Sequence, residues 1–211
     1  MLLPFDQARD QMVREQIEAR GIRDPRVLLA MREIPREAFV PPAQAPFACD
    51  DGPLPIGRGQ TISQPYIVAL MTEALALRPT DRVLEIGAGS GYQSAVLSRL
   101  VGHLCAIERD PLLTDSARQV LARLGIRNVD LRCADGRHGW PEEGSEFDAI
   151  LIACAAAAPP PALLAQLAPG GRMILPVGAP DTIQQLLCLR RDPHGKLFTQ
   201  DHGAVRFVPM V

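Results

Sequence analysis

Residues 82–175 alternate short apolar runs with amphipathic segments, and this alternation constrains the fold more than any other feature of the chain. The apolar runs predict strands at 82–86, 104–108, 128–133, 147–153 and 172–175. The segments between them predict helices at 91–101, 111–124 and 161–167. Buried strands that alternate with helices are typical of an open parallel sheet with helices on both faces.

The residues on either side predict three helices before this sheet and a hairpin after it. The third helix follows Ser63, where apolar residues at 67, 70, 71, 74 and 75 have helical spacing. Residues 5–20 carry apolar side chains at helical spacing and stop at Gly21. A second helix is predicted from Asp24-Pro25 to about Glu33.

A long irregular loop is predicted at 35–59, where proline and glycine are frequent. Loops of this length in compact domains are usually functional. Near the end of the chain, strand-like runs at 184–190 and 204–209 flank a turn at 192–195. They predict an antiparallel hairpin at one edge of the sheet.

The composition argues against several classes of partner. There are 22 Lys+Arg against 24 Asp+Glu, a formal net charge of −2, so no excess of positive charge is available for a phosphate backbone. Aromatic residues are 4%, which leaves few side chains for stacking bases. No apolar run approaches the length of a membrane span or of a signal segment. We therefore expect a cytoplasmic protein that binds neither nucleic acid nor membrane.

The cysteines and histidines show no pattern that would hold a metal or a disulfide framework. The cysteines are odd in number and include no C-x-x-C pair, so we expect reduced thiols. They are Cys49, Cys105, Cys133, Cys154 and Cys188. The four histidines are scattered, with none at i, i+4 spacing, and we expect no metal site.

A glycine-rich loop follows the first strand of the predicted sheet. Gly87, Gly89 and Gly91 are spaced G-x-G-x-G, with Glu85 two residues before them. Tyr92 stands where a dinucleotide fingerprint would need its third glycine. This variant suits S-adenosylmethionine, which has no pyrophosphate to seat on the helix N-terminus. Glu85, Gly87, Gly89 and Gly91 are therefore predicted to bind the cofactor.

Acidic residues end the next two predicted strands. Glu108 is placed to accept hydrogen bonds from ribose hydroxyls, and Asp135, followed by Gly136, can accept from an adenine amino group. Each feature alone is common in proteins without a ligand there. Because the carboxyl ends of parallel strands lie at one edge of a sheet, together they predict a site for an adenosyl ligand without a pyrophosphate.

The chain also resembles a known family, the protein-L-isoaspartate O-methyltransferases, over nearly its whole length. Residues 51–66, DGPLPIGRGQTISQPY, resemble the family's hallmark segment, and residues 83–93, VLEIGAGSGYQ, resemble its cofactor loop. Shorter matches follow in order at 135–136, 139–141, 147–150, 176–178 and 205–209.

This resemblance implies the α/β fold of class I S-adenosylmethionine-dependent methyltransferases. That fold is Rossmann-like, with a seven-stranded, mostly parallel sheet, an antiparallel C-terminal hairpin and, in this family, N-terminal helices. We expect residues 1–62 to form the helices and a substrate-cleft loop, and residues 63–211 to form the methyltransferase core, in one compact unit.

By the same resemblance, the activity is protein repair. A methyl group would pass from S-adenosyl-L-methionine to the free α-carboxylate of L-isoaspartyl residues in damaged proteins and peptides, the expected partners of a monomeric enzyme. Cys49 stands where an aromatic residue is common, which implies a smaller wall in the peptide cleft. The implied site consists of Ser63 as the catalytic residue, Gln60, Thr61 and Ile62 along the cofactor, Glu108 and Arg109 beside its ribose, and Asp135 and Gly136 at its adenine.

Ser63 has two possible roles. The attacking carboxylate has a reference pKa of about 3.5 and is ionised at neutral pH, so the reaction needs no general base. A neutral hydroxyl at Ser63 can orient that carboxylate by hydrogen bonding. Ser63 can equally be the N-cap of a helix with Pro65 in its first turn. Arg206 can likewise bind the substrate carboxylate or lie on a solvated face.

Two other functions are compatible with the cofactor loop. One is an S-adenosylmethionine-dependent methyltransferase of a small molecule or a peptide natural product, which would not need the segment from Gln60 to Pro65. The other is a non-catalytic cofactor-binding adaptor, against which an intact Ser63 argues.

Overall fold

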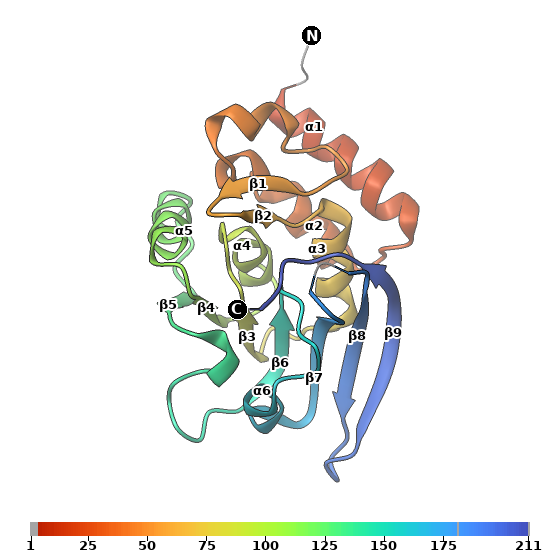
Figure 1. Cartoon of the computed structure of the whole chain (residues 1–211). Coiled ribbons are helices and arrows are strands. Elements are labelled where there is room, and N and C mark those ends of the chain that lie inside the picture. Colours follow the sequence, from red (N-terminus) through yellow and green to blue (C-terminus); the bar gives the residue numbers. More distant parts are fainter. Residues whose placement is uncertain (1–3, 181, 211) are drawn as a thin grey trace.

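The computed structural model describes residues 4–180 and 182–210 of the chain, and its centre is a seven-stranded sheet (Figure 1). The strand order is β5-β4-β3-β6-β7-β8-β9. The strands are β3 (Arg82–Ile86), β4 (His103–Glu108), β5 (Val129–Cys133), β6 (Phe147–Ile152), β7 (Leu167–Val177), β8 (Gln184–Arg191) and β9 (Leu197–Val205). β3 to β7 pair in parallel, whereas β8 and β9 form an antiparallel hairpin at one edge. The expected sheet is confirmed.

The last strand lies elsewhere than the sequence predicts. β9 spans Leu197–Val205 and leaves residues 206–209 outside the strand, in contrast to the predicted run at 204–209. It pairs with β8 from Arg191↔Leu197 to Gln184↔Val205. Most of its side chains are exposed because it is an edge strand, so it carries no apolar alternation by which a strand can be recognised.

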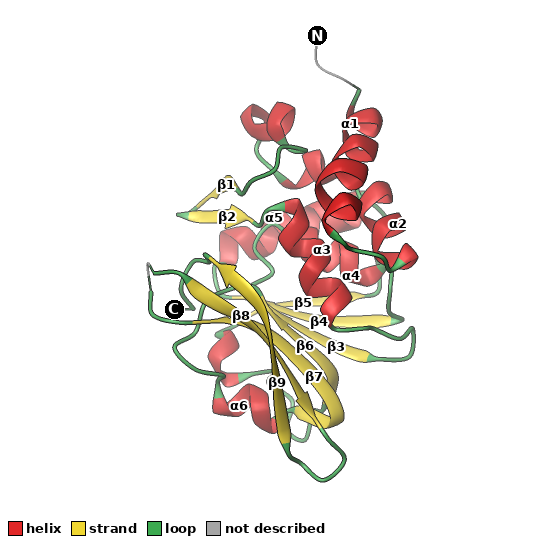
Figure 2. Cartoon of the chain, turned by 90° about the vertical axis from the view of Figure 1, so that its right-hand side faces the viewer, coloured by secondary structure: helices red, strands yellow, loops and turns green. Residues whose placement is uncertain are grey.

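The helices cover the two faces of the sheet unequally (Figure 2). α3 (Pro65–Ala74), α4 (Tyr92–Ser98) and α5 (Pro111–Arg123) lie on one face, and the short α6 (Pro161–Ala165) lies on the other. Successive residues of the central strands enter two separate buried clusters, since neighbouring side chains of a strand point to opposite faces. In β3, for example, Val83 packs under α4, whereas Leu84 and Ile86 pack on the side of α6.

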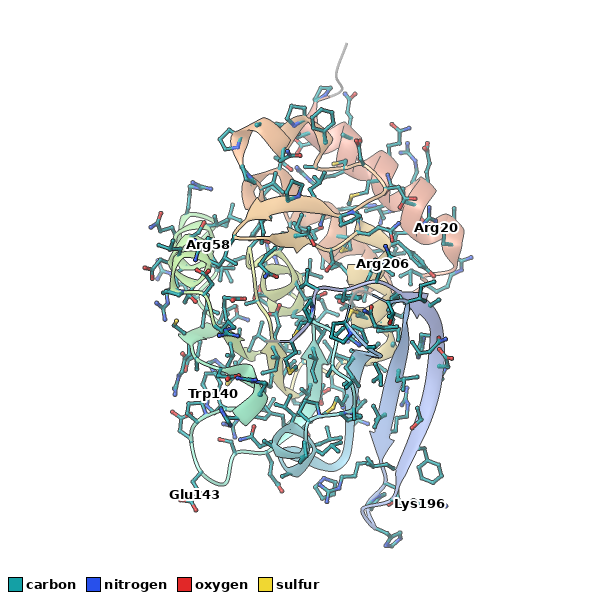
Figure 3. The ribbon with its side chains drawn as sticks, viewed as in Figure 1. Arg20, Arg58, Trp140, Glu143, Lys196 and Arg206 are labelled. Atoms are coloured by element: carbon teal, nitrogen blue, oxygen red, sulfur yellow. The ribbon has the colours of Figure 1, made fainter. Side chains whose placement is uncertain are left out.

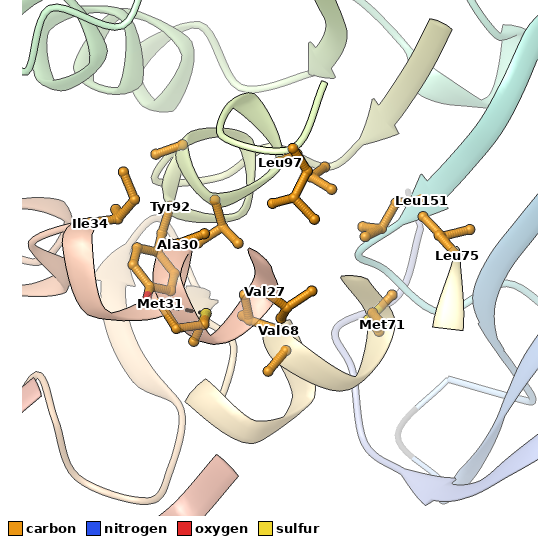
Figure 4. Close-up of a cluster of buried hydrophobic side chains, with 14 of the residues drawn as sticks. Val27, Ala30, Met31, Ile34, Val68, Met71, Leu75, Tyr92, Leu97 and Leu151 are labelled. Carbon is orange, nitrogen blue, oxygen red and sulfur yellow. Dashed lines mark hydrogen bonds between the residues drawn. The ribbon is translucent and has the colours of Figure 1, made fainter. Parts of the chain in front are cut away.

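The two N-terminal helices are present as predicted and share the core of the sheet. α1 (Phe5–Met12) continues as a π-helical and a 3-10 segment to Arg20 and ends at Gly21, whose φ is 101°. The N-cap of α2 (Pro25–Glu33) is Asp24, whose side chain accepts a hydrogen bond from Arg26 N. Figure 4 shows buried side chains of α2 and α3 packed against α4 and β6. The N-terminal segment therefore packs on the helices that cover one face of the sheet and shares their buried core.

The prediction of an irregular loop at 35–59 is partly wrong. Two 3-10 helices, Arg36–Phe39 and Pro42–Phe47, are followed by a hairpin of β1 (Leu54–Gly57) and β2 (Gln60–Ile62). The strands are too short for their alternation to be read from the sequence.

The cysteines and the helix lengths complete the description of the fold. All five cysteines are free, and three of them are buried. Within the described part of the chain, no helix combines the length and the apolar character that crossing a bilayer requires.

Candidate functional site

An open cavity lies at the carboxyl ends of β3, β4 and β6, the edge of a parallel sheet at which ligands usually bind. Its wall includes eight residues predicted from the sequence. They are Gln60, Thr61, Gly87, Gly89, Glu108, Arg109, Asp135 and Gly136. Hairpin β1–β2, the glycine loop and the ends of β4 and β5 are thus brought together at the edge of the sheet where the sequence predicts a ligand.

The glycines of the loop serve two purposes. Gly87 and Gly89 have φ of 83° and 55° and line the cavity, where backbone without side chains leaves room for a ligand. Gly91 also has a left-handed φ, 84°, but does not line the cavity. A Cβ on Gly91 would lie 3.1 Å from Cβ of Ala117, so this glycine allows the start of α4 to approach α5.

Glu108 has the environment that an adenosyl ligand requires. Its two carboxylate oxygens accept one hydrogen bond each, from Gly89 N and from Asp110 N, both at 2.9 Å. Each carboxylate oxygen can accept two bonds, so one acceptor position on each remains for a hydroxyl. Glu108 both holds the glycine loop and lines the cavity, which fits S-adenosylmethionine.

Asp135 and Gly136 line the cavity just after β5, the strand beside Glu108, and the Asp135 carboxylate already has a partner. Asp135 accepts from Arg137 N at 3.0 Å and from the Arg137 guanidinium, which lowers the pKa of Asp135 to about 2. A Cβ on Gly136 would lie 2.4 Å from Cγ2 of Ile86, so only glycine fits there. The Asp135 carboxylate therefore binds the Arg137 guanidinium and also lines the cavity.

Glu85 does not reach the cavity, contrary to the sequence prediction. It lies between Leu84 and Ile86, whose side chains point to the cavity side, so its own points under α4 and is fully buried. Ser94 Oγ donates to Glu85 Oε2 at 2.6 Å, and Oε1 has no hydrogen-bond partner. Burial raises the pKa of the Glu85 carboxyl to about 7.

A second cavity, of about 950 Å³, adjoins the first. Thr61, Ala153 and Val208 line both. Ser63 lines the second cavity, and with Ile62 it also lines a small cleft of about 330 Å³ that reaches Gly87 and Gly89. Ser63 therefore lies at the second cavity, two residues from Thr61, which lines both cavities.

In the structure Ser63 is not the N-cap of α3. α3 begins at Pro65, and its N-cap is Gln64, which makes no side-chain capping hydrogen bond. Ser63 lies one residue too early to cap this helix. None of the described side-chain hydrogen bonds involves the Ser63 hydroxyl, which is half-buried. Its hydroxyl is thus free to bind a ligand in the second cavity.

The sequence analysis did not identify several of the residues that line the first cavity. Ile86, Ile107 and Cys154 line the first cavity from the strand ends, and residues 208–210 cover it from the far end of the chain. Period-two burial could have indicated Ile86 and Ile107, but only tertiary contacts bring residues 208–210 there.

Two residues of the expected peptide cleft have different outcomes. Arg206 is exposed and lines the second cavity, and Figure 3 shows it at the upper end of the sheet, close to the N-terminal helices. Cys49 does not line this cavity and instead lies with Met12 and Gln16 in a separate surface hollow. The smaller cleft wall expected at Cys49 stays a prediction.

Comparison with known proteins decides which family this arrangement represents. Residues 7–211 match the family model described as Protein-L-isoaspartate(D-aspartate) O-methyltransferase. The chain belongs to this family. A protein-L-isoaspartate O-methyltransferase of Methylorubrum extorquens (strain PA1) is 57% identical over 205 residues, 97% of this chain and 89% of that protein. One of Trichlorobacter lovleyi (strain ATCC BAA-1151 / DSM 17278 / SZ) is 53% identical over 211 residues, 100% of this chain and 96% of that protein.

Solved structures share the fold. A protein-L-isoaspartate O-methyltransferase has a TM-score of 0.84 at 30% identity, covering 95% of this chain and 65% of that chain, so this chain spans less than two thirds of it. A protein-L-isoaspartate O-methyltransferase structure from Plasmodium falciparum, in complex with S-adenosyl-L-homocysteine, has a TM-score of 0.83 at 24% identity, covering 96% and 98%.

Membership of the family confirms the expected activity and methyl donor. The enzyme transfers a methyl group from S-adenosyl-L-methionine to isoaspartyl residues of proteins. The match over residues 7–211 favours this repair enzyme over a methyltransferase for small molecules and over a non-catalytic adaptor.

Proposed function

We propose that the first cavity holds S-adenosyl-L-methionine, that the second holds the isoaspartyl peptide, and that Ser63 orients the accepting carboxylate between them. The observation that carries this assignment is the wall common to both cavities, formed by Thr61, Ala153 and Val208. Residues that line both cavities place a donor in one cavity next to an acceptor in the other. The relative from Plasmodium falciparum, which was solved with S-adenosyl-L-homocysteine, supports the first half of the assignment.

The residues of the first cavity would bind the donor by its polar groups. S-adenosyl-L-methionine supplies an electrophilic methyl group on a sulfonium. Glu108 has two free acceptor positions for ribose hydroxyls, with Arg109 beside it. Gln60, Thr61 and Ile62 would contact the donor from the hairpin, and Asp135 and Gly136 from the end of β5.

The residues of the second cavity would orient the acceptor without changing its charge. A peptide α-carboxylate is ionised at neutral pH, so no side chain has to remove a proton. The Ser63 hydroxyl can donate a hydrogen bond to it, whereas a carboxylate at this position would repel it. The Arg206 guanidinium suits the same carboxylate by geometry and charge. Positioning of this kind can lower the barrier by several kcal/mol.

We further propose that the enzyme is a cytoplasmic monomer without affinity for nucleic acid or membranes, and that residues 1–62 and 63–211 form one unit. The near-balanced charge and the shared core of α2, α3 and α4 support this. Light scattering at micromolar concentration tests the oligomeric state, since a dimer would double the mass.

The function is tested by methyl transfer to paired peptides. Labelled S-adenosyl-L-methionine is incubated with two peptides that differ only in an isoaspartyl or a normal aspartyl linkage. We expect base-labile label on the isoaspartyl peptide alone. Equal labelling of both peptides, or of neither, contradicts the assignment of the second cavity.

The role of Ser63 is tested by Ser63→Ala. We expect kcat to fall about a hundredfold, because orientation of the carboxylate is lost, with little change in the dissociation constant of S-adenosyl-L-homocysteine. The melting temperature should stay the same because Ser63 does not cap α3. Ser116→Ala, on the exposed face of α5, is the matched control. A parallel loss of turnover and melting temperature would refute the orienting role.

A further inference from the structure

The segment after β9, residues 206–210, crosses the carboxyl edge of the sheet and forms a strap over both cavities. Figure 1 shows it in dark blue, running from the end of β9 toward the label C. Arg206, Phe207 and Val208 line the second cavity, and Val208, Pro209 and Met210 line the first. The position of the strap therefore decides the shape of both cavities.

The two halves of the strap are held by different residues. Val208 O accepts a hydrogen bond from Ala155 N at 2.8 Å, and Met210 N donates to Ala155 O at 2.7 Å. These bonds hold the half over the first cavity to the segment after β6. They do not involve Arg206 or Phe207, which form the half over the second cavity.

Phe207 is held by a side chain instead of a strand. Its N–H donates to Gln184 Oε1 at 2.8 Å. β8 begins at Gln184, which pairs with Val205, so β8 offers no backbone partner opposite Phe207. The side-chain amide of Gln184 extends the pairing of the two strands beyond the start of β8.

Gln184 itself is fixed in place. It is fully buried and lines neither cavity. The turn between β7 and β8 approaches it so closely that a Cβ on Gly178 would lie 3.0 Å from Cγ and 3.1 Å from Cα of Gln184. Gln184 Nε2 donates to Ala179 O of the same turn at 3.5 Å. A buried amide with this environment has little freedom to adopt another position.

We propose that Gln184 is a positioning residue for the substrate peptide, because it holds Phe207 and with it Arg206 at the wall of the second cavity. The proposal rests on the assignment of that cavity to the peptide. When the acceptor is lost, the Phe207 N–H has no partner in the protein and turns to water, which releases this half of the strap. Ala155 continues to hold the other half. Peptide binding therefore depends on Gln184 more than donor binding does.

The test compares Gln184→Met with Gln185→Met. The two glutamines are neighbours in β8, and Gln185 is exposed on the other face of the strand, so it is a matched control. For Gln184→Met we expect the KM of an isoaspartyl peptide to rise about tenfold. The KM of S-adenosyl-L-methionine and the kcat at saturation should change less than about twofold. Gln185→Met should behave as wild type.

Two further variants separate positioning from general destabilisation. Gly178→Ala brings a methyl group against Gln184 and should raise the peptide KM in the same way. Gln184→Glu keeps an oxygen that can accept from Phe207 N in either protonation state, so its peptide KM should lie closer to wild type than that of Gln184→Met. Destabilisation alone would lower the melting temperature without this split between the two KM values.

The rate at which chymotrypsin cleaves after Phe207 measures how firmly this half of the strap is held, in the absence of S-adenosyl-L-methionine and peptide. We expect faster cleavage in Gln184→Met than in Gln185→Met. Equal cleavage, or a peptide KM equal to that of the control, overturns the proposal. Faster cleavage together with a wild-type enzyme that does not discriminate isoaspartyl from aspartyl peptides would instead refute the assignment of the second cavity.

Discussion

At the scale of single residues, Glu85 shows how one position in a motif acquires a role other than ligand binding. The alternation of β3 directs its carboxyl away from the cavity and under α4, where Ser94 is its hydrogen-bond partner. Burial without a neighbouring cation favours the neutral form. The residue therefore contributes to the pH dependence of stability rather than to donor binding.

Replacing Glu85 by glutamine should remove this dependence. Because the pKa rises from 4.5 to about 7 on folding, the folded protein binds more protons than the unfolded chain between these values. Stability then falls as pH rises through this window and levels off above it. Glu85→Gln mimics the neutral form, so its melting temperature should exceed that of wild type by an amount that grows from about pH 5 to about pH 8.

Thermal unfolding across this pH range measures the effect. Glu143→Gln is the control, since Glu143 is exposed and points away from the protein in Figure 3. Parallel profiles for Glu85→Gln and wild type would show that Glu85 is ionised in the folded protein.

At the scale of elements, hairpin β1–β2 closes the first cavity against the start of α5. Arg58, at the turn of the hairpin, pairs with Asp110 at 2.8 Å. Asp110 also caps α5 by accepting from Leu112 N and Leu113 N, and Arg58 lowers its pKa. Gln60 and Glu108, which both line the cavity, each lie two residues from one member of this ion pair, so the pair joins the hairpin to the end of β4 beside the cavity.

Loss of the Arg58 charge should weaken donor binding modestly. The pair is exposed, so its contribution is small and depends on salt. For Arg58→Gln we expect the dissociation constant of S-adenosyl-L-homocysteine to rise about two- to fivefold at low salt and to approach the wild-type value at high salt. Calorimetric titration measures both, and Arg58→Lys, which keeps the charge, should lie closer to wild type. Unchanged affinity at low salt would mean that the hairpin closes without the ion pair.

At the scale of the whole molecule, Arg172 joins the sheet to the end of α3. From β7 it donates to Leu75 O at 2.5 Å, to Ala76 O at 3.0 Å and to Asp148 O at 3.1 Å. It also pairs with Asp81, and both side chains are buried. Removing the guanidinium leaves a buried carboxylate and three carbonyl groups without this partner.

Arg172→Met should therefore destabilise the protein by about 3–5 kcal/mol, the range for breaking a buried ion pair. For a chain of this size the melting temperature falls by about 10 °C. Arg190→Met is the control, because Arg190 faces Arg172 across the strand pair but is exposed. If residues 1–62 and 63–211 form one unit, fluorescence of Trp140 and far-ultraviolet circular dichroism should shift together. Two separate transitions would contradict this.

The sequence by itself determined the parallel sheet, the glycine loop, the acidic strand ends and the family, because these are encoded locally. Strand and helix periods reflect which neighbours are buried, and a G-x-G-x-G loop with Glu108 and Asp135 after the next two strands follows from the order of parallel strands. Eight predicted residues accordingly line one cavity.

Only the tertiary structure decided how distant segments complete the site. Residues 208–210 reach a cavity formed largely by residues 86–136 because Ala155 holds this half of the strap there. The edge strand β9 has no buried face, so its sequence carries no periodic signal. The side chain of Ser63 lines the second cavity instead of capping α3, because that helix begins two residues later. Such contacts depend on packing between segments far apart in the chain, which no local pattern encodes.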